Sequence, residues 1–156
     1  MFKIQSNLAE VAYKLQVNIR KVEANMSRHI LEVAADGMAL VSHRIQQQGR
    51  NTAGQIMRTK SPRSIQAYSK AAALLRRKKG RQTDHIDFTL EGDLMRNYNI
   101  ISSSAKEAVV GFLDRGMAEI VGYLEAYFGP AFYLSESEKT FLINKLTQKV
   151  LNDLRS

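Results

Sequence analysis

The sequence contains no cysteine, and this absence excludes disulfides, thiolate chemistry and cysteine zinc sites. It also contains no apolar run near the roughly 18 residues that a membrane span requires. Charged residues interrupt the first fifteen positions, "MFKIQSNLAEVAYKL", so they do not resemble a secretory signal. We therefore expect a soluble protein that is made in the cytoplasm and does not bind a membrane.

Acidic residues are missing from one long segment. Between Gly37 and Thr83 there is no Asp or Glu, although the chain contains 15 of them. The same segment holds 11 of the 23 Lys and Arg residues, which leaves 12 basic and 15 acidic residues elsewhere. The net charge of +8 thus describes a mildly acidic body with a strongly basic insert at about residues 49–83. Such an insert is attracted to phosphate backbones or to acidic protein surfaces.

Known enzyme and cofactor motifs are missing as well. There is no Gly-rich phosphate loop, no dinucleotide fingerprint and no nucleophile elbow. Asp84, His85 and Asp87 form one candidate metal group, but no cysteine or second histidine completes it, so we expect them to face solvent or neighbouring cations. Glu91 and Asp93 are candidate paired carboxylates, and the nearby cations make ion pairing the simpler interpretation. We expect no enzyme activity, no cofactor and no metal.

The 156 residues, 44% of them hydrophobic, are expected to form a single domain. The spacing of apolar residues predicts a short helix over residues 6–15, capped by Ser6, and an interruption at Val17-Asn18. A second helix is predicted from Asn18 to about Gln48. Its roughly 45 Å length is unusual in so small a domain and indicates a scaffold or interface element.

The middle of the chain gives less certain patterns. Residues 49–64 are polar and acid-free, which predicts a loop. A helix is predicted from about Ser64 to Gly80, with an extended loop as the alternative. Residues 85–90 alternate polar and apolar positions and predict a short strand, unless Thr89 instead caps a short helix.

The last third of the chain has clearer signals. A β-hairpin is predicted at about residues 97–113, followed by an amphipathic helix over residues 116–128. Ser135 and Glu138 fit a capping box that opens a final amphipathic helix. The predicted fold is therefore α+β, with a long N-terminal helix, a basic loop, a small antiparallel sheet and two C-terminal helices.

The cations of the basic insert are the candidate contact residues. They allow three interpretations: sequence-independent binding of nucleic-acid phosphates, docking on an acidic protein, or an exposed mobile loop. Tyr68 is the only aromatic residue between positions 37 and 83, which disfavours base stacking on a single strand. The candidates are Arg63, Lys70, Arg76, Arg77, Lys78, Lys79 and Arg81.

Several short motifs are weak signals alone, but their order along the chain is informative. The basic stretch "AYSKAAALLRRKKGR" comes after the long Ala-containing helix. It is followed by Leu90–Leu94, by Gly111-Phe112 after a strand, by Phe128-Gly129-Pro130, by Phe132-Tyr133, and by Ser135 at the start of the last helix. From the second helix onward, this order resembles the phage virion-morphogenesis, or tail-completion, family.

The resemblance implies a structural role and no enzyme activity. Proteins of that family are thought to complete the tail or to join head to tail at the neck of the virion, as repeated copies in a ring. The implied partners are other copies of the chain, neighbouring neck, connector or tail-tube proteins, and packaged DNA. The implied location is the virion, with host cytoplasm during assembly. The alternative is a sequence-independent nucleic-acid-binding protein that uses the basic segment 58–81.

Overall fold

The computed structural model describes residue 3 and residues 5–156. The predicted α+β class is confirmed, with a long N-terminal helix, two small antiparallel sheets and C-terminal helices. In chain order the elements are α1 (Leu8–Gln48), β1 (Ser64–Ile65), β2 (Tyr68–Ser69), α2 (Lys70–Lys78), α3 (Asp93–Asn97), β3 (Tyr98–Ser103), β4 (Ala108–Phe112), α4 (Arg115–Phe128) and α5 (Glu136–Arg155).

Helix α1 is a single unbroken helix of 41 residues, about 60 Å long. The predicted interruption at Val17-Asn18 is therefore wrong. The Asn18 side chain does not compete for its own backbone, because its Nδ2 donates to the Leu154 carbonyl at 2.7 Å. The helix begins after Asn7, and Ser6 Oγ accepts the Leu8 N–H at 3.2 Å. It ends as predicted at Gly49, where φ is +60°.

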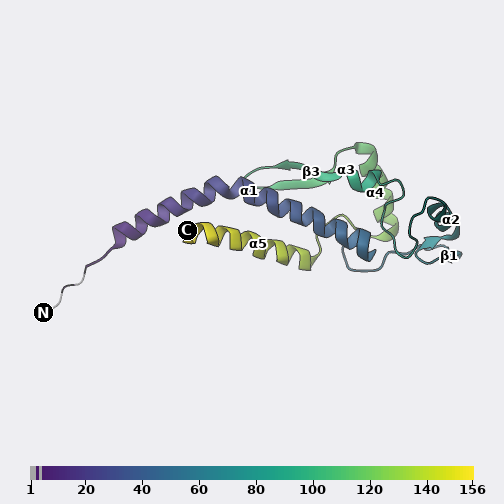
Figure 1. Ribbon diagram of the computed structural model, residues 1–156, viewed down its shortest axis with the longest axis horizontal. Coiled ribbons are helices and arrows are strands. Elements are labelled where there is room, and N and C mark those ends of the chain that lie inside the picture. The colour runs from purple at the N-terminus through teal and green to yellow at the C-terminus, as the bar shows by residue number, and fades with distance from the viewer. Residues whose placement is uncertain (1–2, 4) are drawn as a thin grey trace.

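Helix α5 runs antiparallel beside α1 and covers it from Asn18 to Arg44 (Figure 1). Close approach is possible at Gly37, where a Cβ would lie 3.1 Å from a Leu142 methyl group. Ion pairs and hydrogen bonds flank this seam. They join Asn25 and His29 to Asp153, Glu32 to Lys149, Asp36 to Lys145, and Arg44 to Glu138.

The hairpin β3–β4 lies on the other side of α1 from α5 (Figure 1). It is antiparallel, as predicted, with Tyr98 opposite Phe112 and an irregularity between Ile100 and Ser102. The main core forms where the second half of α1 meets the hairpin and the loops around it. Its buried members are Val41, Ile45, Met57, Ala67, Ile86, Tyr98 and Ala131.

The predicted end of α4 and the predicted start of α5 are confirmed, whereas the cap at the start of α4 was not predicted. Asp114 caps α4 by accepting the Met117 N–H at 3.0 Å, and Gly129 ends it. The capping box of α5 is complete, because Ser135 and Glu138 each bond the backbone N–H of the other. These predictions succeed because capping depends on neighbours within one helical turn.

The basic insert contains more structure than a loop. The helix predicted from Ser64 begins only at Lys70, because residues 64–69 form a tight hairpin in which Gln66 has φ +54°. Ser69 then caps α2 by accepting the Ala72 N–H at 3.4 Å.

Residues 85–90 form neither the predicted strand nor a helix capped by Thr89. Thr89 Oγ1 donates to the Asp87 carbonyl at 2.8 Å, within the loop, and no helix begins at this residue. Phe88 has φ +54°, which breaks an extended strand. The next helix, α3, starts only after Gly92.

Candidate functional site

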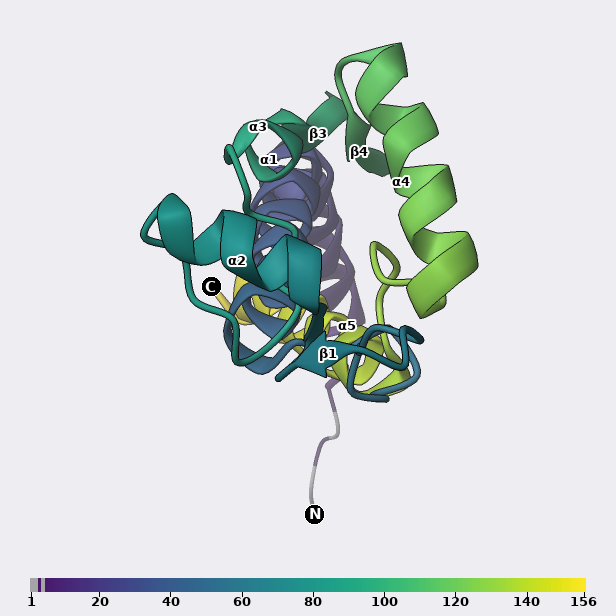
Figure 2. The same cartoon turned by 90° about the vertical axis from the view of Figure 1, so that its right-hand side faces the viewer.

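The candidate cations lie in a small folded unit, which we call the basic lobe and define as residues 57–91. It contains β1, β2, α2 and the loop that follows them. The lobe lies at the opposite end of the molecule from the start of α1 (Figure 1). Viewed from that end, α2 and β1 stand in front of α1, with α4 to one side (Figure 2).

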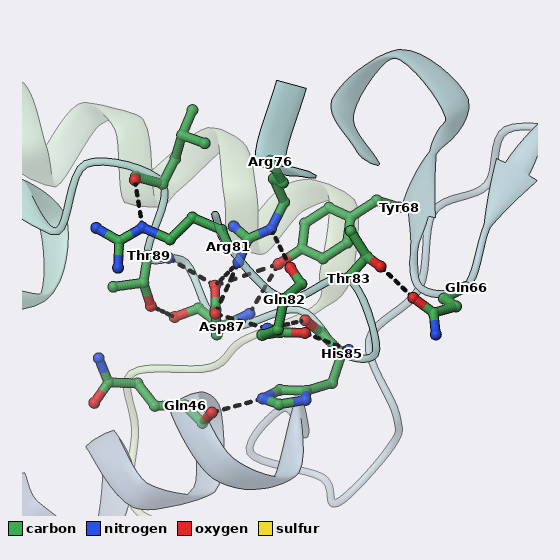
Figure 3. A network of polar contacts seen from close by, with 11 residues as sticks. Gln46, Gln66, Tyr68, Arg76, Arg81, Gln82, Thr83, His85, Asp87 and Thr89 are labelled. Carbon is green, nitrogen blue, oxygen red and sulfur yellow. Dashed lines mark hydrogen bonds and ion pairs between the residues drawn. The ribbon is translucent and has the colours of Figure 1, made fainter. Parts of the chain in front are cut away.

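Arg76 is buried, so its prediction as an exposed contact residue is wrong. Only 4% of its surface is exposed. Its Nη2 donates to both carboxylate oxygens of Asp87, at 2.9 and 3.0 Å, and its Nε donates to the Gln82 carbonyl at 2.7 Å (Figure 3). The guanidinium also stacks 4.4 Å from the centroid of the Tyr68 ring. Arg76 holds the lobe together and cannot reach a partner.

Asp87 is the centre of this network. Besides Arg76, it accepts hydrogen bonds from Gln82 Nε2 at 2.7 Å and from the Thr89 N–H at 2.9 Å (Figure 3). Burial raises the pKa of Asp87, but these donors and Arg76 lower it by more, so the net pKa lies below its ordinary value. Burial and the neighbouring carboxylate raise the pKa of Tyr68 to about 12. The carboxylate is thus fixed in its charged form and the phenol in its neutral form.

The three candidate metal ligands point to different partners. Asp87 is occupied by Arg76, Asp84 accepts from Gln66 at 2.6 Å, and His85 Nε2 lies 2.6 Å from the Gln46 carbonyl. Within the described part of the chain, no group of three His, Asp or Glu side chains is placed to hold a metal ion. Asp84 and Asp87 connect segments within the lobe, and His85 connects the lobe to α1.

Glu91 and Asp93 are ion-paired, as predicted. Glu91 pairs with Lys79 and Asp93 pairs with Arg96. Because both pairs are at the surface, each contributes at most about 1 kcal/mol to stability. Lys79 is therefore partly neutralised, and Arg81 also has a local partner, because its Nε donates to the Leu90 carbonyl at 3.2 Å.

Four of the seven candidate cations remain for an external anion. Arg63, Lys70, Arg77 and Lys78 are exposed, and none has a side-chain partner among residues 3 and 5–156. Arg63 and Lys70 are neighbours, since the Lys70 N–H donates to the Arg63 carbonyl at 3.0 Å. Arg77 and Lys78 lie at the other end of α2, roughly 10 Å away. Two pairs of cations at this separation could contact the phosphates of an extended polyanion. Such contacts do not depend on the base sequence.

A second candidate surface was not expected from the sequence. The first ten residues of α1, Leu8–Val17, are all exposed, and we call them the α1 overhang. The last residues of α5 lie beside Asn18 and Lys21, so α5 covers none of the overhang. Leu8 is 71% exposed and Leu15 54%. The sequence shows an amphipathic helix here, but only the placement of α5 shows that its apolar side is uncovered.

An apolar groove of about 500 Å³ lies between α1, the β3–β4 hairpin and the start of α5. Lys139 is the one charged residue that lines it. Its large apolar lining residues are Ile30, Val33, Met38, Val110, Phe132, Leu134 and Leu142.

Helix α4 presents a third uncovered apolar face. Ile120 is exposed, and Tyr123 is 79% exposed. The inner side of the helix packs through Val121, which is buried. A helix that is apolar on both sides is typical of an element that is covered on both sides.

None of the helices in the described residues combines the length and the apolar character needed to cross a bilayer. No protein-family model, no curated protein and no solved structure matches the chain.

Proposed function

We propose that this chain is a structural virion protein of a tailed phage or prophage, which completes the tail or joins head to tail at the neck as a ring of copies. The observation that supports this role best is the α1 overhang, whose large apolar side chains are uncovered in the single chain. Contiguous exposed apolar surface marks a site of protein–protein contact. The groove and the outer face of α4 supply two further such surfaces.

The two ends of the molecule differ in chemistry, which suits a bridging position between layers of a particle. One end is an amphipathic helix with an uncovered apolar side, and the other is the basic lobe (Figure 1). The paired helices α1 and α5 connect the ends as a stiff rod. Copies in a ring would repeat Arg63, Lys70, Arg77 and Lys78 around its axis, where weak contacts to DNA or to an acidic neighbouring ring add up.

The proposal is tested by deleting the gene in the phage or prophage that encodes it and examining particles by electron microscopy. We expect heads and tails that remain separate, or tails without a completed end, and recovery of joined particles when the gene is supplied from a plasmid. Joined, infectious particles in its absence would overturn the proposal. The gene neighbourhood gives an independent check, because capsid and tail-tube genes should lie beside it.

A second candidate function is sequence-independent nucleic-acid binding, favoured by the free cations of the basic lobe. Affinity for duplex DNA should then fall steeply between 50 and 200 mM salt. The double variant Arg77→Ser with Lys78→Ser should reduce the slope of log K against log salt by about 1.8, since each phosphate contributes about 0.9. The matched control removes two exposed cations elsewhere, Lys106→Ser with Arg115→Ser. Equal slopes for the two double variants would exclude the lobe as the binding surface.

A further inference from the structure

The apolar side of the α1 overhang belongs to a stripe that runs along the whole helix. Within the overhang, Leu8, Val11, Ala12 and Leu15 stand at positions i, i+3, i+4 and i+7 of one helical face. The same face continues through the part of α1 that α5 and the groove residues adjoin. Its later members are Ile19, Val22, Met26, Ile30, Val33 and Gly37. The overhang therefore continues a seam that is already an interface within the chain.

The overhang cannot fill the groove of its own chain. Leu8 precedes Ile30, the first groove residue, by 22 positions of an unbroken helix, which corresponds to about 33 Å. Folding back would require a break in α1, and the helix has no proline or glycine between Leu8 and Asp36. An overhang that occupies the groove must therefore come from another copy of the chain.

The groove suits an apolar helix better than a charged ligand. Its lining is apolar apart from Lys139, and that lysine already pairs with Glu136 at 2.7 Å. The overhang is equally close to neutral, because its two charged residues, Glu10 and Lys14, pair with each other at 2.7 Å. Neither surface offers a net charge to DNA or to an acidic protein. The two surfaces match in polarity.

We propose that the α1 overhang of one copy docks in the groove of the next copy. Leu8, Val11 and Leu15 are the anchors, spaced as in other amphipathic helices that lie in apolar grooves. The two contacting surfaces are different, so the contact is head-to-tail, and such contacts generate a closed ring when the rotation between copies permits. This inference rests on the proposed function and names the contact that builds the ring. The groove and overhang lie outside the basic lobe, which stays available for a second partner.

The absence of cysteine allows a direct test by cross-linking. Ala12→Cys places a thiol within the stripe and keeps the three anchors, and Ala34→Cys places one in the groove. Equal amounts of the two single variants are mixed and treated with a short bis-maleimide. The matched controls are Val17→Cys, on the other side of the overhang, and Ala35→Cys, the exposed neighbour of Ala34. We expect the 12–34 pair to give at least tenfold more cross-linked dimer than 17–34 or 12–35.

Each outcome has a defined meaning. Efficient cross-linking of Ala12→Cys to itself would show pairing between overhangs and would overturn the inference. Failure of the 12–34 pair in a chain that light scattering shows to be oligomeric would overturn the docking contact and leave the ring role intact. If the purified chain is a monomer, the same pairs are cross-linked within purified particles. Absence of the chain from those particles would overturn both proposals.

A second variant guards against an effect of the introduced thiols. Val11→Ser with Leu15→Ser removes two anchors from an exposed helix end, so the circular dichroism spectrum should remain that of the original chain. Light scattering should show loss of the oligomer and a mass near the 17.6 kDa of one copy. An unchanged oligomer mass would contradict the docking of the overhang.

Discussion

Arg76 and Arg77 are adjacent in sequence and have opposite roles. Arg76 shares the inner face of α2 with Ala73, and both are buried, whereas Arg77 points to solvent. The sequence places five cations within six residues and gives no reason to separate them. Helical periodicity would have suggested that one of them faces inward, but its partner, Asp87, lies eleven residues later. A contact of that range is decided by the path of the intervening loop.

Replacing Arg76 with Met should destabilise the protein by roughly 3 kcal/mol, because Asp87 would remain as a buried charge without its cation. Urea denaturation followed by circular dichroism would measure this loss. Arg77→Met is the matched control and should change the free energy of unfolding by less than about 0.5 kcal/mol. Equal effects of the two substitutions would contradict the structural role assigned to Arg76.

The ionisation of Glu138 should make the stability of the protein depend on pH in the acid range. Burial raises its pKa, but hydrogen bonds from Arg44 and from the Ser135 N–H lower it by more, so its net pKa lies below the ordinary 4.5. A carboxyl group with a depressed pKa in the folded state stabilises folding above its unfolded pKa, and this contribution is lost as the pH falls through the folded value. The free energy of unfolding should therefore decline as the pH drops below about 4.5.

Glu138→Gln isolates that contribution. At pH 7 the variant should be less stable by roughly 2 kcal/mol, since it loses a charge-assisted bond to a buried arginine. The difference from the original chain should shrink as the pH falls below about 4.5. Glu136→Gln, which alters an exposed carboxylate two residues earlier, should have little effect at any pH. A pH-independent difference for Glu138→Gln would show that its charge is not the cause.

Among the helices and strands, the ones with strong local signals formed where they were predicted. The hairpin β3–β4, helix α4 and helix α5 depend on turn residues, caps and periodicity that lie within a few positions. Two of the errors occurred where a contact with a residue distant in sequence decided the outcome. The sequence predicts a helix start at Asn18, but this residue lies inside α1, where its side chain donates to the Leu154 carbonyl. The sequence predicts that Tyr68 is part of a helix, but it lies in strand β2. Its ring packs on Arg76 and its hydroxyl donates to Asp87.

Gly122, inside α4, and Gly129, which ends α4, should respond to substitution by alanine in opposite directions. Gly129 has φ +86° and ψ 162°, a region that other residues avoid, and a Cβ there would lie 2.8 Å from Asn51 Nδ2. Gly129→Ala should destabilise the protein by roughly 2 kcal/mol or more. Gly122 lies within the helix with no atom within 4 Å of an added Cβ, so Gly122→Ala should stabilise by roughly 0.5–1 kcal/mol. Thermal denaturation of both variants would reveal the contrast, and a stabilising Gly129→Ala would refute the backbone argument.

The molecule as a unit is an elongated rod with different chemistry at its two ends. The helix pair α1–α5 forms the rod, the basic lobe closes one end, and the α1 overhang extends beyond the other (Figure 1). The buried core lies near the basic lobe, around Val41 and Ile45. The overhang lies outside this core.

Deleting residues 8–17 should leave the folded body almost unchanged. All ten side chains are exposed, so their removal should alter the free energy of unfolding by less than about 1 kcal/mol at a dilution where the chain is monomeric. The helical circular dichroism signal should fall only by the share of these ten residues. A loss of several kcal/mol would mean that the overhang packs on its own chain, and it would contradict docking of the overhang on another copy.

The sequence by itself determined the α+β class, the hairpin, the two C-terminal helices and the concentration of cations in one insert. Each of these depends on periodicity, capping or composition, which act over short stretches of chain. The tertiary structure decided which cation is buried, where α1 continues without a break and which part of it has no covering helix. Those outcomes depend on contacts between residues that are up to 136 positions apart, as between Asn18 and Leu154. Local sequence patterns do not specify such contacts, because the path of the whole chain determines which distant residues meet.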